Sequence, residues 1–322
     1  MGRLFLFIFF FSLNGIAQGS GQPVLDVLMR MQAALQNLNY HGTLVYLQDG
    51  QVQSMRIIHK ANKNGEQERL ISLNGVAREI IRKDDVVTCY MPDKKKVTVD
   101  KRQYNRHMLS KLVENDFSAL QKYYDFKLEA DDRIAGLKAQ RVLIQPRDQL
   151  RYGYRLWLGE KDALLLKSDL LNVSGEVLEQ VMFADINIVD EIPSHMLKPV
   201  STGEGFSRFE HGLDNKNNHT ASENWKIKSL PEGFSISAHV RQALPDSEQP
   251  AEQWIATDGL ASVSIYVEEL VAGSDVFEGN MQKGAMNIFG LLLSGHQVTA
   301  VGEVPPYTVE TIARSVAMIK KP

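Results

Sequence analysis

The stretch between residues 40 and 99 constrains the fold most, because its apolar residues recur with a period of two. Residues 42–47 and 52–58 alternate in this way on either side of a short polar turn at residues 48–51. Gly50 supplies the positive φ that a tight hairpin turn needs. The sequence therefore predicts an antiparallel meander, whose further strands lie at residues 66–73, 77–82, 85–90 and 95–99.

Helical spacing flanks this meander. Apolar residues recur at intervals of three and four over residues 26–38, which predicts an amphipathic helix, and a second helix is predicted over residues 105–124. A sheet with helices set beside it, instead of between every strand pair, indicates the α+β class. Strands are then expected to resume at residues 126–129, 138–145, 152–158, 164–171 and 177–187.

A polar, turn-rich segment at residues 201–222 predicts a linker between two domains, at residues 22–200 and 223–319. In the second domain Thr308 is expected to cap a helix over residues 309–318. Ordered segments are expected there at residues 234–237, 253–257, 281–293 and 297–303, and a strand is expected at residues 261–267.

The N-terminus predicts export from the cytoplasm. Arg3 precedes an apolar run at residues 4–13, and small residues follow up to Ala17, which is the pattern of a secretory signal peptide. We expect residues 1–17 to be removed, with cleavage as late as residue 21, and the mature protein to be soluble. With Cys89 as the single cysteine, an intramolecular disulfide is impossible. Cys89 is then a buried strand residue, or it forms an intermolecular disulfide or is a reactive thiol.

The motifs of common enzymes are missing. The sequence contains no phosphate-binding glycine loop, no dinucleotide fingerprint and no nucleophile elbow. None of the eight histidines forms the i,i+4 pair of a zinc protease helix. A formal charge of −3 argues against a nucleic-acid surface. We therefore expect a binding protein with no catalytic residue, metal or cofactor.

Two groups of cations are candidates for contact with an anionic ligand. Lys94, Lys95 and Lys96 form one, and a solvated hairpin tip is the alternative interpretation. Arg151 and Arg155 form the other, because guanidinium groups bind carboxylates and phosphates bidentately. Ion pairing to Asp148 or Glu160 is the alternative for the arginines.

Residues 146–158, followed by residues 164–168, resemble the RseB/MucB family. The most distinctive part reads Arg151-Tyr152-Gly153-Tyr154-Arg155-Leu156-Trp157-Leu158. Gly159 departs from the pattern, since an aspartate is expected there. Further blocks that resemble the family lie at residues 87–92, 133–136, 230–234, 258–264 and 301–305, so the resemblance spans nearly the whole mature chain.

The resemblance implies a periplasmic regulator of an envelope-stress sigma factor. Family members bind the periplasmic part of a transmembrane anti-sigma factor of the RseA/MucA type, shield it from site-1 proteolysis, and release it on sensing lipopolysaccharide or lipid. The first domain would be a LolA-like unclosed antiparallel half-barrel with covering helices, and the smaller α+β second domain would bind the anti-sigma factor. A periplasmic carrier of lipid or lipoprotein is the alternative function. The oligomeric state stays open, a homo-oligomer included.

Within this framework, specific residues become candidates for each task. Aromatic side chains of the second domain, Trp225, Phe234, Trp254 and Tyr266, are candidate anchors for the partner. An acyl chain gains about 0.8 kcal/mol for each CH₂ group that it buries on an apolar face. The candidate lining residues of such a lipid cavity are Leu44, Tyr46, Met55, Ile57, Met108 and Leu112.

Overall fold

The computed structural model describes residues 22–319 apart from 64, 102–111, 113–114, 202, 212–223, 244–249, 272 and 274. The predicted signal peptide and Met108 lie outside the described residues. Within the described part of the chain, no helix combines the length and the apolar character needed to cross a membrane.

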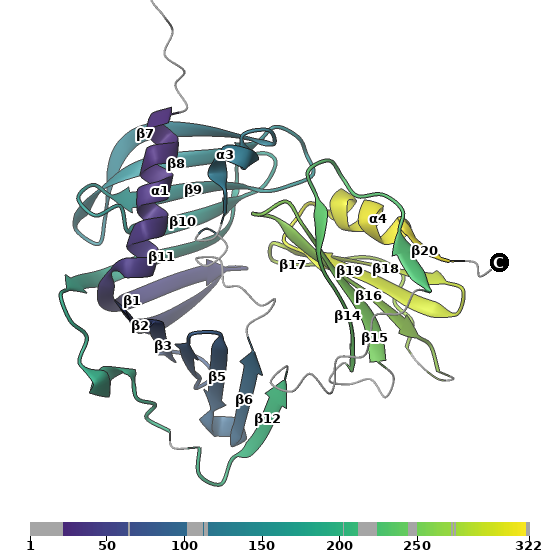
Figure 1. The fold of residues 1–322 in the computed structure, drawn as a ribbon, viewed down its shortest axis with the longest axis horizontal. Coiled ribbons are helices and arrows are strands. Elements are labelled where there is room, and N and C mark those ends of the chain that lie inside the picture. The colour runs from purple at the N-terminus through teal and green to yellow at the C-terminus, as the bar shows by residue number, and fades with distance from the viewer. Residues whose placement is uncertain are drawn as a thin grey trace, which may run out of the picture.

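A twelve-stranded sheet dominates the N-terminal half (Figure 1). Its strand order is β12-β6-β5-β4-β3-β2-β1-β11-β10-β9-β8-β7, and the two outermost strands do not pair with each other, so the sheet is an unclosed half-barrel. This confirms the predicted fold class. The strands are β1 (Asn39–Gln48), β2 (Gln51–Asn62), β3 (Gly65–Ser72), β4 (Glu79–Lys83), β5 (Val86–Met91), β6 (Lys96–Lys101), β7 (Tyr124–Ile134), β8 (Leu137–Pro146), β9 (Gly153–Gly159), β10 (Leu165–Leu171), β11 (Val177–Val189) and β12 (Ser207–His211).

Helix α1 (Gln22–Asn37) lies across the concave face of this sheet, as Figure 1 shows. Its apolar stripe, which includes Leu28 and Met31, packs in one buried cluster with Leu44, Ile57 and Leu156 of the strands. Helix α3 (Phe117–Leu120) adds Phe117 and Leu120 to the same cluster, and Asp116 caps it by accepting hydrogen bonds from Ser118 N and Ala119 N. The concave face is therefore the core of the N-terminal domain.

The sheet bends where β1 meets β11. The register shifts between Thr43 and Leu44, which marks a β-bulge, and bulges increase the local bend and twist of a strand. Gly42 precedes the bulge, and a Cβ atom there would lie 2.3 Å from the carbonyl oxygen of Asp185. Glycine is required at this position because the two backbones approach so closely.

A strap leads from β11 over the convex face of the sheet. It contains the short helix η2 (Ser194–Leu197), and Ile192 and Leu197 pack against Ile58 of β2. Arg69 and Glu79 form a buried ion pair below the strap. Arg69 Nη1 donates to the carbonyl of Met196 at 2.7 Å, and the amide of Val200 donates to Glu79 at 3.0 Å. The ion pair therefore fastens the strap to the sheet.

Part of the segment predicted to be a linker is ordered as a strand. Residues 207–211 form β12, which pairs with β6 in parallel. The amide of Ser207 donates to Lys95 O at 2.8 Å, and the Lys96 ammonium lies 4.3 Å from the Phe209 ring centroid. The polar composition of the segment hid this strand, because an edge strand is held mainly by its backbone hydrogen bonds.

The C-terminal half contains a six-stranded antiparallel sheet in the order β14-β15-β16-β19-β18-β17. Helix α4 (Pro306–Arg314) covers one face of this sheet, and Val263, Ile265, Phe289 and Val309 are among its buried core residues. The strands are β14 (Ser235–Ala243), β15 (Pro250–Thr257), β16 (Ser262–Glu269), β17 (Gly279–Lys283), β18 (Met286–Leu293) and β19 (His296–Gly302), and a separate pair joins β13 (Trp225–Ile227) to β20 (Val316–Met318).

The predicted C-terminal helix is displaced and shorter. It begins at Pro306, where proline is favoured because its missing N–H needs no partner, and Thr308 therefore lies inside the first turn instead of capping it. The helix ends at Arg314, and residues 316–318 pair with β13. The prediction failed because β20 is specified by a partner some ninety residues earlier in the chain, which helical spacing does not reveal.

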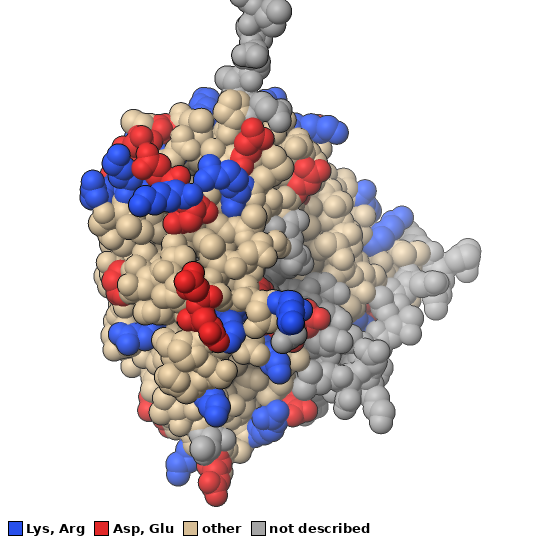
Figure 2. Space-filling view, turned by 60° about the vertical axis from the view of Figure 1, so that its left-hand side comes forward, with Lys and Arg blue, Asp and Glu red and all other residues tan. Residues whose placement is uncertain are grey.

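Charges of both signs are interspersed on the face drawn in Figure 2, with wide uncharged areas between them. Buried polar pairs are therefore the more informative electrostatic features. The Arg69–Glu79 pair is such a case, since both side chains are less than a tenth exposed.

Replacing Glu79 with alanine should destabilise the protein by about 3–5 kcal/mol, because it leaves a buried and uncompensated Arg69 guanidinium. Urea unfolding followed by tryptophan fluorescence measures the change. Glu210→Ala is the matched control: its partner Arg208 is more than half exposed, so this change should cost less than about 1 kcal/mol. Equal unfolding midpoints for the two variants would contradict the role given to the pair.

Candidate functional site at the domain interface

The loop between β8 and β9 joins the two domains. Three consecutive residues of this loop, Leu150, Arg151 and Tyr152, each bond to a different element of the C-terminal domain. Asp148 shapes the loop by accepting hydrogen bonds from the Leu150 amide at 3.0 Å and from Arg151 Nε at 3.1 Å. We call residues 150–152 the clamp.

Arg151 is the centre of the clamp, and its side chain is fully buried. Its Nη1 pairs with Asp258 Oδ2 at 2.7 Å, and its Nη2 donates to the carbonyl of Glu232 at 2.6 Å. The guanidinium carbon lies 5.1 Å from the ring centroids of both Tyr123 and Phe234, one from each domain. A guanidinium group in this setting gains both hydrogen bonds and cation–π contacts.

Asp258 likewise has several hydrogen-bond donors around its carboxylate. It accepts hydrogen bonds from the Tyr124 hydroxyl at 2.9 Å and from the amides of Leu260 and Ala261 at 3.0 and 2.7 Å. Burial raises the pKa of Asp258, and the Arg151 guanidinium offsets part of that rise. Burial likewise raises the pKa of the Tyr124 hydroxyl, so Tyr124 stays a hydrogen-bond donor.

Two neutral hydrogen bonds flank the ion pair. The Thr308 hydroxyl, in the first turn of α4, donates to Leu150 O at 2.7 Å. The side chain of Asn287 at the start of β18 donates to the Tyr152 hydroxyl at 3.0 Å and to Val304 O at 2.8 Å. Consecutive residues on one side thus engage α4, the β15–β16 turn and β18 on the other, which fixes the relative orientation of the domains.

A second contact lies beside the clamp, at the turn between β17 and β18. Ala285 of this turn is fully buried and belongs to the core cluster of the N-terminal domain. Its amide donates to the carboxylate of Glu179, which also accepts from the Tyr46 hydroxyl at 2.7 Å and from Gln48. The Glu303 carboxylate of the C-terminal domain is close enough to raise the pKa of Glu179.

Burial is the main cause of the raised pKa of Glu179, and Glu303 adds to it, while the hydrogen bonds from Tyr46 and Gln48 act against it. Two carboxyl groups therefore approach each other across the interface. This contact is electrostatically unfavourable when both are ionised. The clamp differs from this contact because opposite charges meet there.

The structure brings several of the predicted lipid-cavity residues together. Leu44, Ile57 and Leu112 are buried in the same cluster of the N-terminal core. Met55 is half-buried and pairs with Leu44 across the β1–β2 ladder, so the two share the concave face. Tyr46 lies on that face too, and its hydroxyl reaches Glu179 at the domain interface. The lining of the predicted cavity therefore touches the contact between the domains.

The predicted partner anchors lie mainly in the C-terminal core. Trp225, Phe234 and Trp254 are less than a tenth exposed and pack in one cluster. Tyr266 faces away from α4, where its hydroxyl accepts from Gln253 at 3.0 Å. Of the four anchors, Tyr266 alone keeps a partly exposed side chain.

The predicted cations are separated in space. Arg151 is buried in the clamp, so the alternative interpretation, pairing with Asp148, describes it better. Arg155 pairs with Glu129 on β7 at 3.0 Å, and Glu160 lies near Lys138 instead. Lys94 and Lys95 are exposed, and Lys96 is half-buried over Phe209.

Cys89 is a free, half-buried thiol on β5. Burial raises its pKa, which lowers the thiolate fraction on which reactivity depends. The position agrees with a structural strand residue. Among the described residues, no group of three or more histidine, cysteine or acidic side chains is arranged to hold a metal ion.

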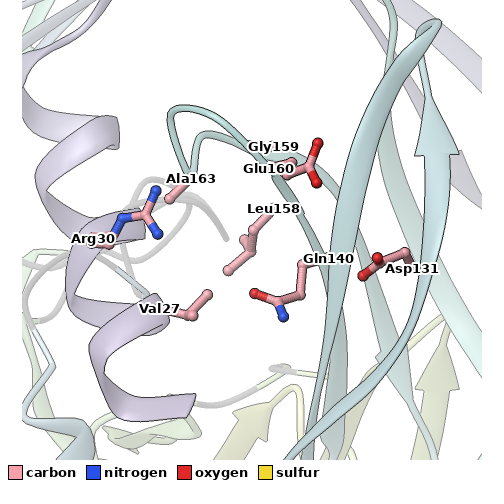
Figure 3. Close-up of a pocket in the computed structure, with 8 residues that line it drawn as sticks. All are labelled: Val27, Arg30, Asp131, Gln140, Leu158, Gly159, Glu160 and Ala163. Atoms are coloured by element: carbon pink, nitrogen blue, oxygen red, sulfur yellow. The ribbon is translucent and has the colours of Figure 1, made fainter. Parts of the chain in front are cut away.

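A small pocket opens at the end of the half-barrel opposite the clamp, between α1 and strands β7 to β9 (Figure 3). Arg30 of α1 lines it on one side, and Asp131 and Glu160 line it on the other. Its volume of about 110 Å³ suits a few water molecules and is well below the roughly 300–1,000 Å³ of typical ligand pockets.

Gly159, where the family pattern leads us to expect an aspartate, is one of the residues that line this pocket. A Cβ atom at Gly159 would lie 2.5 Å from Asp162 Oδ1, and that oxygen accepts from the Leu164 amide at 2.8 Å. The carboxylate of Asp162 thus shapes the β9–β10 turn and occupies the space that a side chain at position 159 would need.

Sequence models of two domains match the chain. The MucB/RseB N-terminal domain matches residues 23–201 and the MucB/RseB C-terminal domain matches residues 219–317. The sigma-E factor regulatory protein RseB of Haemophilus influenzae is 28% identical over 306 residues, which are 94% of each chain. The sigma factor AlgU regulatory protein MucB of Pseudomonas aeruginosa is 29% identical over 310 residues, which are 95% of this chain and 94% of that protein.

Solved structures are similar over the same length. A complex of Pseudomonas aeruginosa MucA and MucB matches with a TM-score of 0.74 and 27% identity, covering 93% of this chain and 100% of that one. A crystal structure of MucB matches with a TM-score of 0.65 and 27% identity, covering 92% and 98%. The proteins in these comparisons are named for regulation of a sigma factor, not for a reaction that they catalyse.

Arg151→Met should destabilise the protein by about 3–5 kcal/mol, because it leaves the Asp258 carboxylate buried without its cation. Arg155→Met is the matched control, since Arg155 is partly exposed and should cost no more than about 1 kcal/mol. Urea unfolding gives both values. Amide hydrogen exchange at Leu260 and Ala261, which bond to Asp258, should accelerate in Arg151→Met alone. Unchanged exchange there would refute the clamp.

Glu179→Gln should stabilise the protein at neutral pH and flatten its pH dependence. A carboxyl whose pKa is raised in the folded state favours folding when protonated. Its contribution is complete below the usual glutamate pKa of about 4.3 and is lost as pH rises through the folded pKa. Thermal unfolding between pH 4 and 8 should show the variant and wild type converging in acid. Glu176→Gln, at an exposed turn, serves as control, and parallel curves for Glu179→Gln and wild type would contradict the assignment.

Proposed function

The chain belongs to the MucB/RseB family, and on this premise we propose that it binds the periplasmic part of a transmembrane anti-sigma factor. In that complex it shields the anti-sigma factor from site-1 proteolysis, and it releases the factor when lipopolysaccharide or another lipid occupies the N-terminal domain. The protein is a regulatory binding protein and not an enzyme. It acts in the periplasm, where such a partner exposes its regulated domain.

The observation that carries the proposal is the match of both domains to MucB, which has been crystallised together with MucA. The clamp adds a physical reason why both domains matter. A carrier needs only an apolar concave face, whereas a regulator needs that face to influence a distant surface. The buried interface between the domains is the element through which such influence can pass.

Tyr46 links the concave face, where we place the lipid, to the contact between the two domains. Leu44 and Tyr46 occupy alternate positions of β1, so both point to the concave face, and Tyr46 bonds to Glu179, which bonds to Ala285 of the C-terminal domain. An acyl chain that enters beside Leu44 must displace packing around Tyr46. Displacing its hydroxyl leaves Glu179 with one donor fewer, so the buried carboxylate is less well stabilised against the nearby Glu303. The ion pair of the clamp does not involve Glu179.

Binding of the mature chain to the periplasmic fragment of the anti-sigma factor encoded in the same genome tests the proposal. Calorimetry should give a stoichiometric complex, and the fragment in that complex should resist the site-1 protease. Added lipopolysaccharide should weaken binding by tenfold or more, which corresponds to about 1.4 kcal/mol. Absence of binding would eliminate the regulator assignment, and binding of lipid alone would leave the carrier as the function.

Met55→Trp should change the lipid concentration needed for release by about fivefold or more while partner affinity stays within twofold, because Met55 lies on the concave face beside Leu44 and is not part of the C-terminal core. Met29→Trp is the matched control, since Met29 lies on the exposed face of α1. Release curves measured by fluorescence anisotropy of a labelled fragment provide the comparison. Superimposable curves for Met55→Trp and wild type would remove Met55 from the lipid site.

A further inference from the structure

Exposed aliphatic side chains gather at one end of the half-barrel. Val52 lies on the convex face opposite Leu47 in the β1–β2 hairpin, and Leu73 continues the β3 ladder opposite Ser54. Val52 is 55% exposed, Leu73 is 49% exposed, and Val76 in the β3–β4 connection is 64% exposed. Neighbouring aliphatic groups with this much exposure are uncommon on soluble proteins and indicate an interaction surface.

The backbone below these side chains is rigidly held. Asn74 accepts from the Ser54 amide at 2.7 Å and donates to Val52 O at 2.8 Å, so it bridges the β1–β2 hairpin and the β3–β4 connection. The Leu73 amide donates to Ser54 O at 2.8 Å. The apolar groups are therefore presented by a fixed scaffold, and their exposure is not the result of a loose loop.

Cations adjoin these aliphatic groups. The short helix η1 (Pro92–Lys94) and Lys95, which has a left-handed backbone with φ of 44°, form the β5–β6 turn. The Asp93 carboxylate accepts from the Ala77 amide at 3.2 Å, which joins this turn to the connection that carries Val76. Lys94 and Lys95 are exposed, and no described residue forms an ion pair with either.

Two of the acidic groups nearby are engaged in other contacts, and Glu204, three residues before the Ser207 that bonds to Lys95 O, is exposed. Asp93 is engaged by the Ala77 amide, and Asp49 at the hairpin tip lies next to Gly284 of the C-terminal domain. Arg78, exposed and adjacent to Ala77, adds a third cation. We define the rim patch as the aliphatic residues Val52, Leu73 and Val76 with the cations Arg78, Lys94 and Lys95.

We propose that the rim patch docks the protein on the surface of a bilayer that contains anionic phospholipids. Each lysine or arginine near such a surface strengthens binding about fivefold, and apolar side chains that enter the interface add a part that salt does not screen. Strands β5, β6 and β12, with the segment that leads into β12, form the lower corner of the molecule in Figure 1, so the β5–β6 turn lies near an outer end of the molecule. Turn tips that combine cations with aliphatic groups suit a plane of phosphates better than a single peptide, which needs a groove.

Docking at this end is separate from lipid binding on the concave face. Val52 and Leu73 lie on the convex side, whereas Leu44 and Met55 lie on the concave side. The rim patch would hold the protein close to the membrane in which its proposed partner is anchored. This inference does not depend on the partner, because its test uses lipid vesicles alone.

Flotation of the mature chain with vesicles tests the proposal. Vesicles of phosphatidylcholine with 30% phosphatidylglycerol should bind the protein at about 50 mM NaCl, pure phosphatidylcholine should bind it weakly, and binding should fall steeply by about 500 mM NaCl. Lys94→Glu/Lys95→Glu should reduce binding by twentyfold or more. Lys63→Glu/Lys161→Glu makes the same charge change in turns at the opposite end of the sheet and should retain most of the binding.

Leu73→Ser/Val76→Ser should weaken the binding that remains at high salt. Equal losses in the two lysine double variants would overturn the proposal, since binding would then follow net charge alone. Failure of anionic vesicles to bind the protein at low salt would also overturn it. A change of oligomeric state in Leu73→Ser/Val76→Ser, measured by light scattering, would assign the patch to a second copy of the chain instead.

Discussion

The ion pair between Arg151 and Asp258 is the interaction on which the arrangement of the molecule depends. Both side chains are fully withdrawn from solvent, and the guanidinium group also bonds to Asp148 and to the carbonyl of Glu232. A buried pair of this kind contributes little net stability compared with an apolar contact of the same size. Removing one partner, however, leaves an uncompensated buried charge, which is strongly unfavourable. Its effect is therefore specificity: the domains dock in the one orientation in which both charges are satisfied.

The second contact between the domains has the opposite electrostatic character. Glu179 meets the Ala285 amide, but Glu303 of the same domain brings a like charge close to it. The interface thus combines an oriented contact between opposite charges at residues 150–152 with a contact near the concave face that brings like charges together. Because the second contact borders the apolar face through Tyr46, it is the part of the interface that a ligand on that face can perturb first.

Sequence patterns predicted the antiparallel strands well because these alternate with a period of two, whereas the unclosed half-barrel was implied only by the family resemblance. They predicted less of the site. Arg151 was singled out as a cation, yet its partner lies 107 residues further along, and no local pattern connects the two. Asp258, Asn287 and Thr308 were missed for the same reason, although the turn motif around Asp258 had been recognised within the family resemblance. Strand β12 was taken for a linker because its stability comes from backbone pairing with β6 and not from apolar side chains.

The placement of the two interface contacts limits how the domains can move. The clamp lies in the loop before β9, whereas the Glu179 contact lies at the β1–β11 pair, two strands further across the sheet. The three bonds of the clamp engage α4, the β15–β16 turn and β18, so they hold the C-terminal domain in one orientation even if the Glu179 contact opens. Ala285 of the Glu179 contact and Asn287, which bonds to Tyr152, are two residues apart in the chain. A loss of packing near Tyr46 would therefore act first on the β17–β18 turn, at the edge of the clamp.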